Sequence, residues 1–411
     1  LLGVVSHGLL LHWLVPALVW TTAWAPLAFV VVVTVLSMLS ALFGWALHRA
    51  IHGAGAPVWL ALPVAWTARE WAQGHLPGPL AFPWLELPVA LTGFPELLGM
   101  AELVGGRGVT FWIVLVNGLG AWLILGWRRR GWALRVSASA AVVMVAVAPG
   151  LWGVQRARTL STAPVTRVVV AGTDLPAGAR ADPERWNAAM ASTLDTAIVD
   201  LDGISFDLLV LPEGAMMGAV TPGDDAMILT RRGEVAAVHD ATVLLGVYTL
   251  GDISENLAVL LTPNGALHAP YRKRRLVPLV EWLPGDPPVD LSTPVVLSRT
   301  SDAVSGGVVR FGPLICFEVI FPDAARRARL AGADILVNVS NDAWFSASGG
   351  LGAVGRLQHA AHLVVRSVEH RMGAVRSANG GPSFGVDPIG RVQVAASGTS
   401  PTVLGLSLIH I

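Results

Sequence analysis

Long apolar stretches fill the first third of the chain. Five of them are about as long as a helix that crosses the roughly 30 Å hydrocarbon core of a membrane, and they cover residues 9–24, 26–47, 56–72, 109–127 and 132–152. Residues 26–47, with the sequence PLAFVVVVTVLSMLSALFGWAL, keep no polar face at helical spacing. The pattern therefore predicts about five membrane-spanning helices, of which 26–47 is the clearest.

The pattern changes near residue 165. Short β-branched runs, separated by Gly, Pro and Asp turns, then alternate with segments of helical length, which is typical of an α/β domain of roughly 240 residues. The expected strands cover residues 165–172, 206–213, 241–249, 257–263, 308–318, 333–342 and 372–379. The expected helices cover residues 182–200, 321–333 and 355–371.

This change divides the chain into a transmembrane domain at 1–155 and an α/β domain at 156–411. Basic residues lie in two short connections between spans, at 48–52 and 128–130, and the positive-inside rule makes both connections cytoplasmic. The α/β domain is then expected on the outer side of the membrane. The Pro- and Gly-rich stretch 73–108 falls on the same side and is expected to be an interfacial loop.

The composition indicates a membrane protein and excludes only a few other features. Hydrophobic residues make up 53% of the chain and charged residues 14%, with a mean hydropathy of +0.60, outside the range of an ordinary soluble domain. Lys and Arg together number 28, and so do Asp and Glu together, so no excess of positive charge indicates a nucleic-acid partner. Cys316 is the only cysteine, which excludes an intramolecular disulfide and a multi-cysteine metal site.

Polar side chains stand at the ends of three apolar strands. Glu213 ends one run, Cys316 and Glu318 end a second, and Asn341 and Asp342 end a third. In open α/β sheets the ligand site lies beyond the carboxyl ends of the strands. These side chains are therefore expected to converge on one site.

A cysteine is a useful nucleophile only as a thiolate, so it needs a base or a nearby cation. Glu213 can supply the base, and Lys273, in the basic segment YRKRRLVPLVEWLP, can supply the cation. Lys273 and the backbone N–H of Phe317 can also stabilise the oxyanion formed on an ester or amide, by about 3 kcal/mol per donor. A Cys–His arrangement with His359 is an open alternative. A lone cysteine on an apolar strand is also typical of simple core packing.

Four segments, in chain order, resemble the nitrilase or carbon–nitrogen hydrolase superfamily: LVLPEGAM, YRKRRLVPLVEWLP, GPLICFEVIFPD and VNVSNDAWF. The stretches AREWAQG and FPWLELP in the apolar half look like those of the apolipoprotein N-acyltransferase family. The resemblance implies a multi-span α-helical membrane domain followed by an α/β, nitrilase-like αββα sandwich.

The resemblance also implies roles for individual residues. Glu213 is the expected general base, Lys273 the oxyanion stabiliser and Cys316 the nucleophile. The expected supporting or substrate-binding residues are Glu281, Phe317, Glu318, Trp186, Trp344 and Asn341. Phe317 and Gly214 depart from the family, which commonly has Tyr and Ser at these positions.

The implied reaction is an N-acylation in two steps. A fatty acyl chain moves from a membrane phospholipid to Cys316 as a thioester, and then to the α-amino group of the diacylglyceryl-cysteine of an apolipoprotein. No metal or cofactor is expected, and the implied location is the bacterial cytoplasmic (inner) membrane with the catalytic domain on the periplasmic side. Two alternatives stay open: a membrane-tethered amidase or nitrilase that hydrolyses a small amide, and a non-enzymatic membrane scaffold.

The two ends of the sequence depart from what the resemblance implies. The chain opens on Leu1 without an initiating Met, and it ends at VLGLSLIHI, where the family has a last transmembrane helix. We expect both ends to be truncated.

Overall fold

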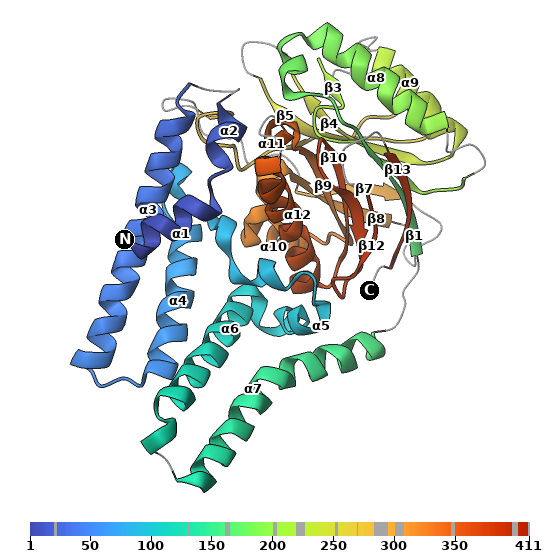
Figure 1. Cartoon of the computed structure of the whole chain (residues 1–411). Helices are drawn as coiled ribbons and strands as arrows, with labels where there is room; N and C mark the ends of the chain where they lie inside the picture. Colours follow the sequence, from blue (N-terminus) through green and yellow to red (C-terminus); the bar gives the residue numbers. More distant parts are fainter. Residues whose placement is uncertain are drawn as a thin grey trace. The chain divides into compact units, whose positions relative to one another are not determined.

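The computed structural model describes the chain except for residues 20–22, 130, 161–164, 200–203, 219–226, 251–253, 269, 283–294, 301–307, 347–349, 397–401 and 410–411. The chain forms two compact units (Figure 1). Unit 1 comprises Leu1–His12 and Leu27–Leu160, and unit 2 comprises Trp13–Pro26 and Ser161–Ile411. Each unit is described by itself.

Unit 1 is helical. Its helices are α1 (Leu2–Leu10), α3 (Ala25–His48, continued by a π-helical turn at Arg49–Gly53), α4 (Val58–Gly74), α5 (Pro95–Leu98), α6 (Ala101–Leu125) and α7 (Trp132–Thr159). Residues between α4 and α5 form short 3₁₀ turns at Gly78–Leu80, Pro83–Leu85 and Leu87–Leu91, as their prolines require. The expected loop at 73–108 therefore contains turns and a short helix, and α6 begins within it.

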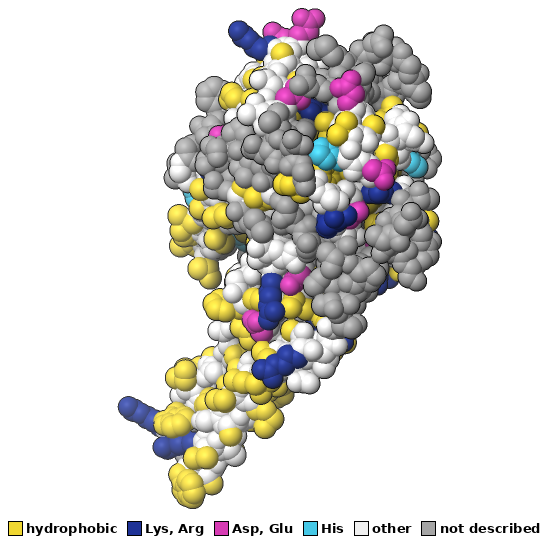
Figure 2. All heavy atoms as spheres, turned by 90° about the vertical axis from the view of Figure 1, so that its right-hand side faces the viewer, with side chains coloured by type: hydrophobic (Ala, Val, Ile, Leu, Met, Phe, Trp, Pro, Cys, Tyr) yellow, Lys and Arg dark blue, Asp and Glu magenta, His cyan; other side chains and the backbone are white. Residues whose placement is uncertain are grey.

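Among the described residues, three helices are long and apolar enough to cross a membrane: Ala25–Gly53, Ala101–Leu125 and Trp132–Thr159. Few of their side chains are buried within the protein, and hydrophobic side chains predominate over the long helices at the bottom of the view in Figure 2. A helix that is apolar on all sides and unburied requires an apolar surrounding. The expectation of a multi-span membrane domain is confirmed.

The predicted span at 9–24 is wrong. Helix α1 ends at Leu10, and a separate short helix, α2 (Leu14–Leu18), follows a turn. Pro16 has no N–H for a continuous helix, whereas in the first turn of α2 that N–H would have no partner to bond. Helix α4 has 17 residues and is not among the three long apolar helices. The total number of spans stays a prediction.

Polar contacts hold α4, α6 and α7 together. The buried Glu70 carboxylate of α4 accepts a hydrogen bond of 2.6 Å from the Thr110 hydroxyl of α6 and one of 3.1 Å from the Leu87 N–H. Arg156 of α7 forms a 2.6 Å ion pair with Glu102 of α6. Gly153 of α7 is so close to the preceding chain that a Cβ would lie 2.0 Å from a carbonyl oxygen. The motif AREWAQG, which contains Glu70, is thus a structural junction.

Unit 2 contains two β-sheets. The first has the order β13 (Thr402–Ile409), β1 (Val165–Gly172), β2 (Leu208–Val210), β4 (Thr242–Tyr248), β5 (Asn256–Leu261) and β6 (Tyr271–Arg272), with β3 (Met216–Met217) also paired to β4. The second has the order β12 (Val392–Ala396), β11 (Ser383–Val386), β10 (Gly373–Asn379), β9 (Ile335–Asn341), β8 (Val308–Ile315) and β7 (Leu297–Thr300). The central strands β1, β2 and β4 are parallel, as are β8, β9 and β10.

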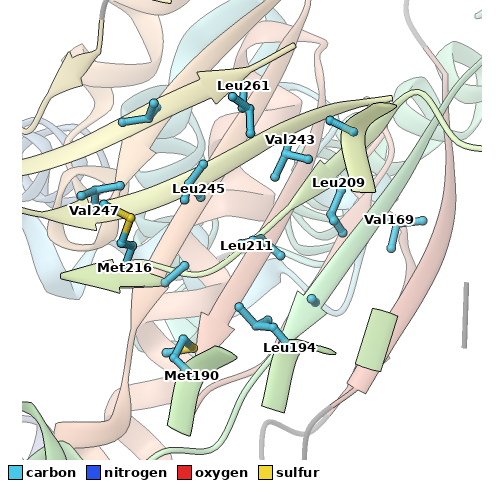
Figure 3. Packing of buried hydrophobic residues seen from close by; sticks show 14 of the residues in the cluster. Val169, Met190, Leu194, Leu209, Leu211, Met216, Val243, Leu245, Val247 and Leu261 are labelled. Carbon is cyan, nitrogen blue, oxygen red and sulfur yellow. The ribbon is translucent and has the colours of Figure 1, made fainter. Parts of the chain in front are cut away.

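Helices cover the outer faces of the two sheets. The helices α8 (Pro183–Val199) and α9 (Met227–Val238) pack on the first sheet, and α10 (Pro322–Leu330) and α12 (Gly350–His370) pack on the second. Alternate residues of each strand face opposite layers. In β1, Val169 belongs to the core under α8 and α9 (Figure 3), whereas Val168 belongs to the core between the sheets. This arrangement is the expected αββα sandwich, which is confirmed.

All seven expected strands are present, with one difference that matters for the site. Strand β8 ends at Ile315, and Cys316 begins a 3₁₀ turn, Cys316–Ile320. The prediction that the strand continues through Glu318 is wrong, because Cys316 adopts a left-handed backbone with φ of 49°. Helix α9 and strands β3, β6, β7, β11, β12 and β13 had no clear signal in the sequence.

Candidate active site

The predicted polar strand ends meet between the two sheets. Glu213 follows β2 and Lys273 follows β6, both in the first sheet, whereas Cys316 follows β8 and Asn341 ends β9 in the second. The Glu213 carboxylate accepts a 2.7 Å hydrogen bond from the Asn341 backbone N–H. One carboxylate therefore joins the two sheets at the site.

A buried lysine lies between two glutamates. The Lys273 ammonium is 3.2 Å from a carboxylate oxygen of Glu213 and 2.8 Å from one of Glu281. The Asn256 side-chain amide donates to the same two oxygens, at 2.6 and 2.8 Å. Lys273 is 1% exposed and Glu213 is 2% exposed, so these charges interact in a medium that screens them little.

The two charges of this pair stabilise each other. Burial raises the pKa of Glu213, but the Lys273 ammonium and the Asn256 amide more than offset it and hold that pKa below its usual value. Burial lowers the pKa of Lys273, but Glu213 and Glu281 more than offset it and hold that pKa well above its usual value. Glu213 is thus a carboxylate and Lys273 an ammonium at neutral pH.

Cys316 is buried and its thiol is protonated at rest. Burial, and then the Glu213 charge, raise the pKa of the Cys316 thiol well above its usual value, while Lys273 only partly compensates. The left-handed φ of 49° is uncommon for a residue other than glycine and turns the chain sharply after β8. Such strained positions are found at functional sites more often than elsewhere.

Glu318 fixes this turn to the segment that carries Lys273. Its fully buried carboxylate accepts a 2.8 Å hydrogen bond from the Ile315 N–H and another of 2.8 Å from the Tyr271 hydroxyl. The backbone N–H groups of Arg274 and Arg275 donate to it as well, at 2.8 and 3.3 Å. Glu318 therefore sets the position of Cys316 relative to Lys273.

His359, the alternative base, is also close to Cys316, but each of its ring nitrogens already has a hydrogen-bond partner. One ring nitrogen, Nε2, lies 3.0 Å from the carbonyl oxygen of Cys316, and the other, Nδ1, lies 3.1 Å from Asp342. Asp342 is in turn 2.5 Å from Arg376. Burial raises the pKa of Asp342, but Arg376, His359 and Ser340 together more than offset it and hold that pKa well below its usual value. The imidazole thus supports the Cys316 backbone, which favours Glu213 as the candidate base.

Within the described part of the chain, one trio could offer three ligand atoms to a metal ion. It consists of Cys316, Asp342 and His359, whose donor atoms lie within 4.8 Å of one another. The Arg376 guanidinium bound to Asp342 would repel a cation there, and a thiol with a raised pKa is a poor ligand. These donors fit an internal hydrogen-bond network better than a metal site.

The aromatic residues predicted for the site differ in their burial and contacts. Trp186 is fully buried and its indole donates a 2.7 Å hydrogen bond to the Gly214 carbonyl, so it supports the turn after Glu213; its expected place in a substrate site stays a prediction. Trp344 is partly buried and packs against the core between the sheets. Phe317 is nearly buried and makes an edge contact with Phe321.

The sequence analysis missed two parts of this site. Asn256 binds both glutamates, but in the run SENLAVLL it has no feature that distinguishes it from an ordinary residue at a strand start. Arg180 and Tyr248 form a stacked pair whose charge interacts with Glu213, and their separation in sequence hides it.

The raised pKa of Cys316 predicts slow reaction with thiol reagents at pH 7. Because only the thiolate reacts, the rate of modification by methyl methanethiosulfonate should rise about tenfold per pH unit. Glu213→Gln should increase that rate at a given pH, since the Glu213 charge raises the thiol pKa. Mass spectrometry measures the modification, with Glu255→Gln, a partly exposed glutamate paired to Arg272, as the control. A slower reaction in Glu213→Gln would contradict this electrostatic assignment.

Comparison with known proteins matches both halves of the chain. Residues 182–406 match the carbon–nitrogen hydrolase family, and residues 1–119 match the apolipoprotein N-acyltransferase N-terminal domain. An apolipoprotein N-acyltransferase from Bradyrhizobium diazoefficiens is 31% identical over 402 residues, which cover 90% of this chain and 71% of that protein. The chain belongs to the apolipoprotein N-acyltransferase family.

The chain is also similar to a second curated relative and to a solved structure. The apolipoprotein N-acyltransferase of Shewanella oneidensis is 26% identical over 378 residues, covering 84% of this chain and 68% of that protein. Among solved structures, an amidase from Nesterenkonia sp. is 20% identical, with a TM-score of 0.42, over 61% of this chain and 92% of that chain. The expected family is confirmed, and the chain is a membrane protein with the carbon–nitrogen hydrolase domain of an acyltransferase.

Proposed function

We propose that this protein transfers a fatty acyl chain from a membrane phospholipid to the α-amino group of the diacylglyceryl-cysteine of apolipoproteins, by way of a thioester on Cys316. Membership of the apolipoprotein N-acyltransferase family supports the overall reaction. The observation that carries the mechanism is the buried Lys273 ammonium between Glu213 and Glu281, at 3.2 and 2.8 Å, beside the only cysteine in the chain.

In the first step, the Cys316 sulfur attacks the carbonyl carbon of the phospholipid ester. Glu213 takes the thiol proton as the S–C bond forms, because the resting thiol does not ionise by itself. The tetrahedral oxyanion is stabilised by Lys273 and by the backbone N–H of Phe317. The C–O bond then breaks, the proton passes from Glu213 to the leaving oxygen, and a lysophospholipid departs from the thioester.

In the second step, the neutral α-amino group of the acceptor attacks the thioester carbonyl. Glu213 takes a proton from the attacking amine, the C–S bond breaks, and the proton returns to the Cys316 sulfur. An amide forms and the thiol is restored, so atoms and charges balance over the cycle. The same carboxylate thus acts as base and as acid in both steps.

Three buried polar atoms support a substrate at this site. The Asn341 side-chain nitrogen, the Asn256 side-chain oxygen and the Trp344 indole nitrogen have no hydrogen-bond partner among the described residues. A buried polar group without a partner costs about 1–3 kcal/mol, and a bound ester or amine can satisfy it. We propose that Trp344 and Asn341 contact the substrate, with Phe317 next to the reacting carbon.

The membrane helices indicate on which side of the membrane unit 2 works. The basic residues Arg49 and Arg128 lie at the ends of α3 and α6, in connections that the positive-inside rule assigns to the cytoplasm. Helix α7 then leads outward to unit 2. We propose that unit 2 works at the outer surface of the cytoplasmic membrane, where phospholipid and lipid-anchored acceptors are both present.

Intact-mass spectrometry of the protein mixed with phospholipid tests this function. We expect a fatty-acyl adduct that hydroxylamine removes, because hydroxylamine cleaves thioesters, and that Cys316→Ala lacks. A synthetic diacylglyceryl-cysteine peptide should discharge the adduct and gain the same acyl mass.

Two other results would contradict the proposal. A folded protein that forms no adduct but releases ammonia from a small amide would be the membrane-tethered amidase. A Cys316→Ala variant that still acylates the peptide would remove Cys316 from the mechanism.

A further inference from the structure

A partly buried arginine, whose charge interacts with the two glutamates, has no role in the mechanism above. Arg180 lies in the 3₁₀ turn Ala177–Ala181, between β1 and α8. Its guanidinium carbon is 4.2 Å from the centre of the Tyr248 ring, which is a stacking contact. Its charge interacts with Glu213 and Glu281, and more weakly with the Cys316 sulfur.

Tyr248 is a rigid platform for this guanidinium. It ends β4, where it pairs with Asn256, the residue that binds both glutamates. Its other neighbour is Gly214, where a Cβ would lie 2.5 Å from the Tyr248 ring and where φ is +71°. The glycine that replaces the usual serine of this family therefore leaves room for the ring. The Tyr248 ring thus contacts both Arg180 and the residue that follows Glu213.

Stacking on a ring leaves the hydrogen-bond donors of an arginine available. The five N–H groups lie in the plane of the guanidinium and point away from the ring below it. Within the described part of the chain, the structure shows no hydrogen bond or ion pair from the Arg180 guanidinium to another residue. Planar, paired donors of this kind match the oxygens of a phosphate.

The position relative to the nucleophile matches one substrate class. In a glycerophospholipid the phosphate is separated from the acyl ester by the glycerol carbons, so an anion site must lie near the nucleophile but not at it. Arg180 lies in this region, because its guanidinium stacks on Tyr248, the strand partner of the residue that binds both glutamates. Lys273 cannot serve, because the two glutamates already bind it.

We propose that Arg180, held on Tyr248, binds the phosphodiester of the acyl donor and of the lysophospholipid that leaves. This proposal rests on the proposed function, since it assigns the donor's phosphate to that same site. It makes Arg180 a determinant of donor choice, which favours phosphate-bearing esters over neutral ones.

The test compares two acyl donors in detergent micelles. Thioester formation on Cys316 is timed by intact mass with phosphatidylethanolamine and with p-nitrophenyl palmitate, which has no phosphate. Arg180→Gln keeps a polar side chain and removes its charge. We expect the ratio of the phospholipid rate to the p-nitrophenyl ester rate to fall by about 30-fold, as for the loss of a charged hydrogen bond. Arg180→Lys should recover part of the ratio.

Arg185→Gln is the matched control, because Arg185 is an exposed arginine at the start of α8. It should leave the ratio unchanged. If Arg180→Gln lowers both rates equally, or neither, the proposal is wrong while the acyl-enzyme function stands. If the wild type forms no thioester from either donor, the proposed function fails and this proposal fails with it. Thermal unfolding confirms that each variant is folded.

Discussion

Lys273→Met is expected to abolish acyl transfer, with a loss of about a thousandfold or more, because it removes the cation that we propose stabilises the oxyanion. The substitution also changes the pKa of Glu213, the proposed base. Without the ammonium, the effect of burial, which raises the pKa of Glu213, is no longer opposed by Lys273, so we expect Glu213 to become a weaker acceptor for the Cys316 proton. Thioester formation, followed by intact mass, measures both effects together.

Arg272→Met is the control for this substitution. Arg272 is the preceding residue, and its ion pair with Glu255 is partly exposed on both sides, so its loss should cost less than about 1 kcal/mol and leave transfer intact. If the Lys273→Met variant is folded and transfers acyl chains at near the wild-type rate, the assignment of Lys273 is wrong.

Glu318→Ala is expected to lower both stability and activity without touching the reacting atoms. Four donors lose their acceptor: the Tyr271 hydroxyl and the backbone N–H groups of Ile315, Arg274 and Arg275. Because a buried donor without a partner costs about 1–3 kcal/mol, the free energy of unfolding should fall by more than about 3 kcal/mol. Thermal unfolding in detergent measures the change.

The control for Glu318 is Asp323→Ala. Asp323 is also a carboxylate bound by two arginines, Arg275 and Arg327, but it is 42% exposed, so its removal should cost less than about 1 kcal/mol. Equal destabilisation by the two substitutions would mean that Glu318 does not hold the turn at Cys316. Glu318→Gln, which keeps one acceptor oxygen, should lie between Glu318→Ala and the wild type.

The sequence predicted the meeting of the strand ends for a physical reason. Parallel strands end at the same edge of a sheet, so polar residues that follow apolar runs gather there. Glu213, Asn341 and Cys316 obey this rule. The alternation of strand and helix patterns predicted an α/β domain, whereas the αββα sandwich was expected only from the family resemblance.

Other features of the fold and the site depend on contacts between residues far apart in the sequence, which no local sequence pattern indicates. The break between α1 and α2 reflects Pro16 and the packing of Trp13, whose indole donates to Gln358 far along the chain. The left-handed turn at Cys316 is held from outside by Glu318 and His359. Trp186 was expected near the substrate because of the family resemblance, which gave no sign that its indole would donate to the Gly214 carbonyl.

The hydrogen bond between Glu213 and the Asn341 backbone has a consequence for biogenesis. It joins residues 128 positions apart, one from each sheet, so the base is in place only after both halves of the sandwich have assembled. A partly synthesised chain already carries its membrane helices, and an active thiol there would deacylate the surrounding lipids. We expect such a chain to be inert, because the carboxylate that takes the proton is correctly held only by the finished fold.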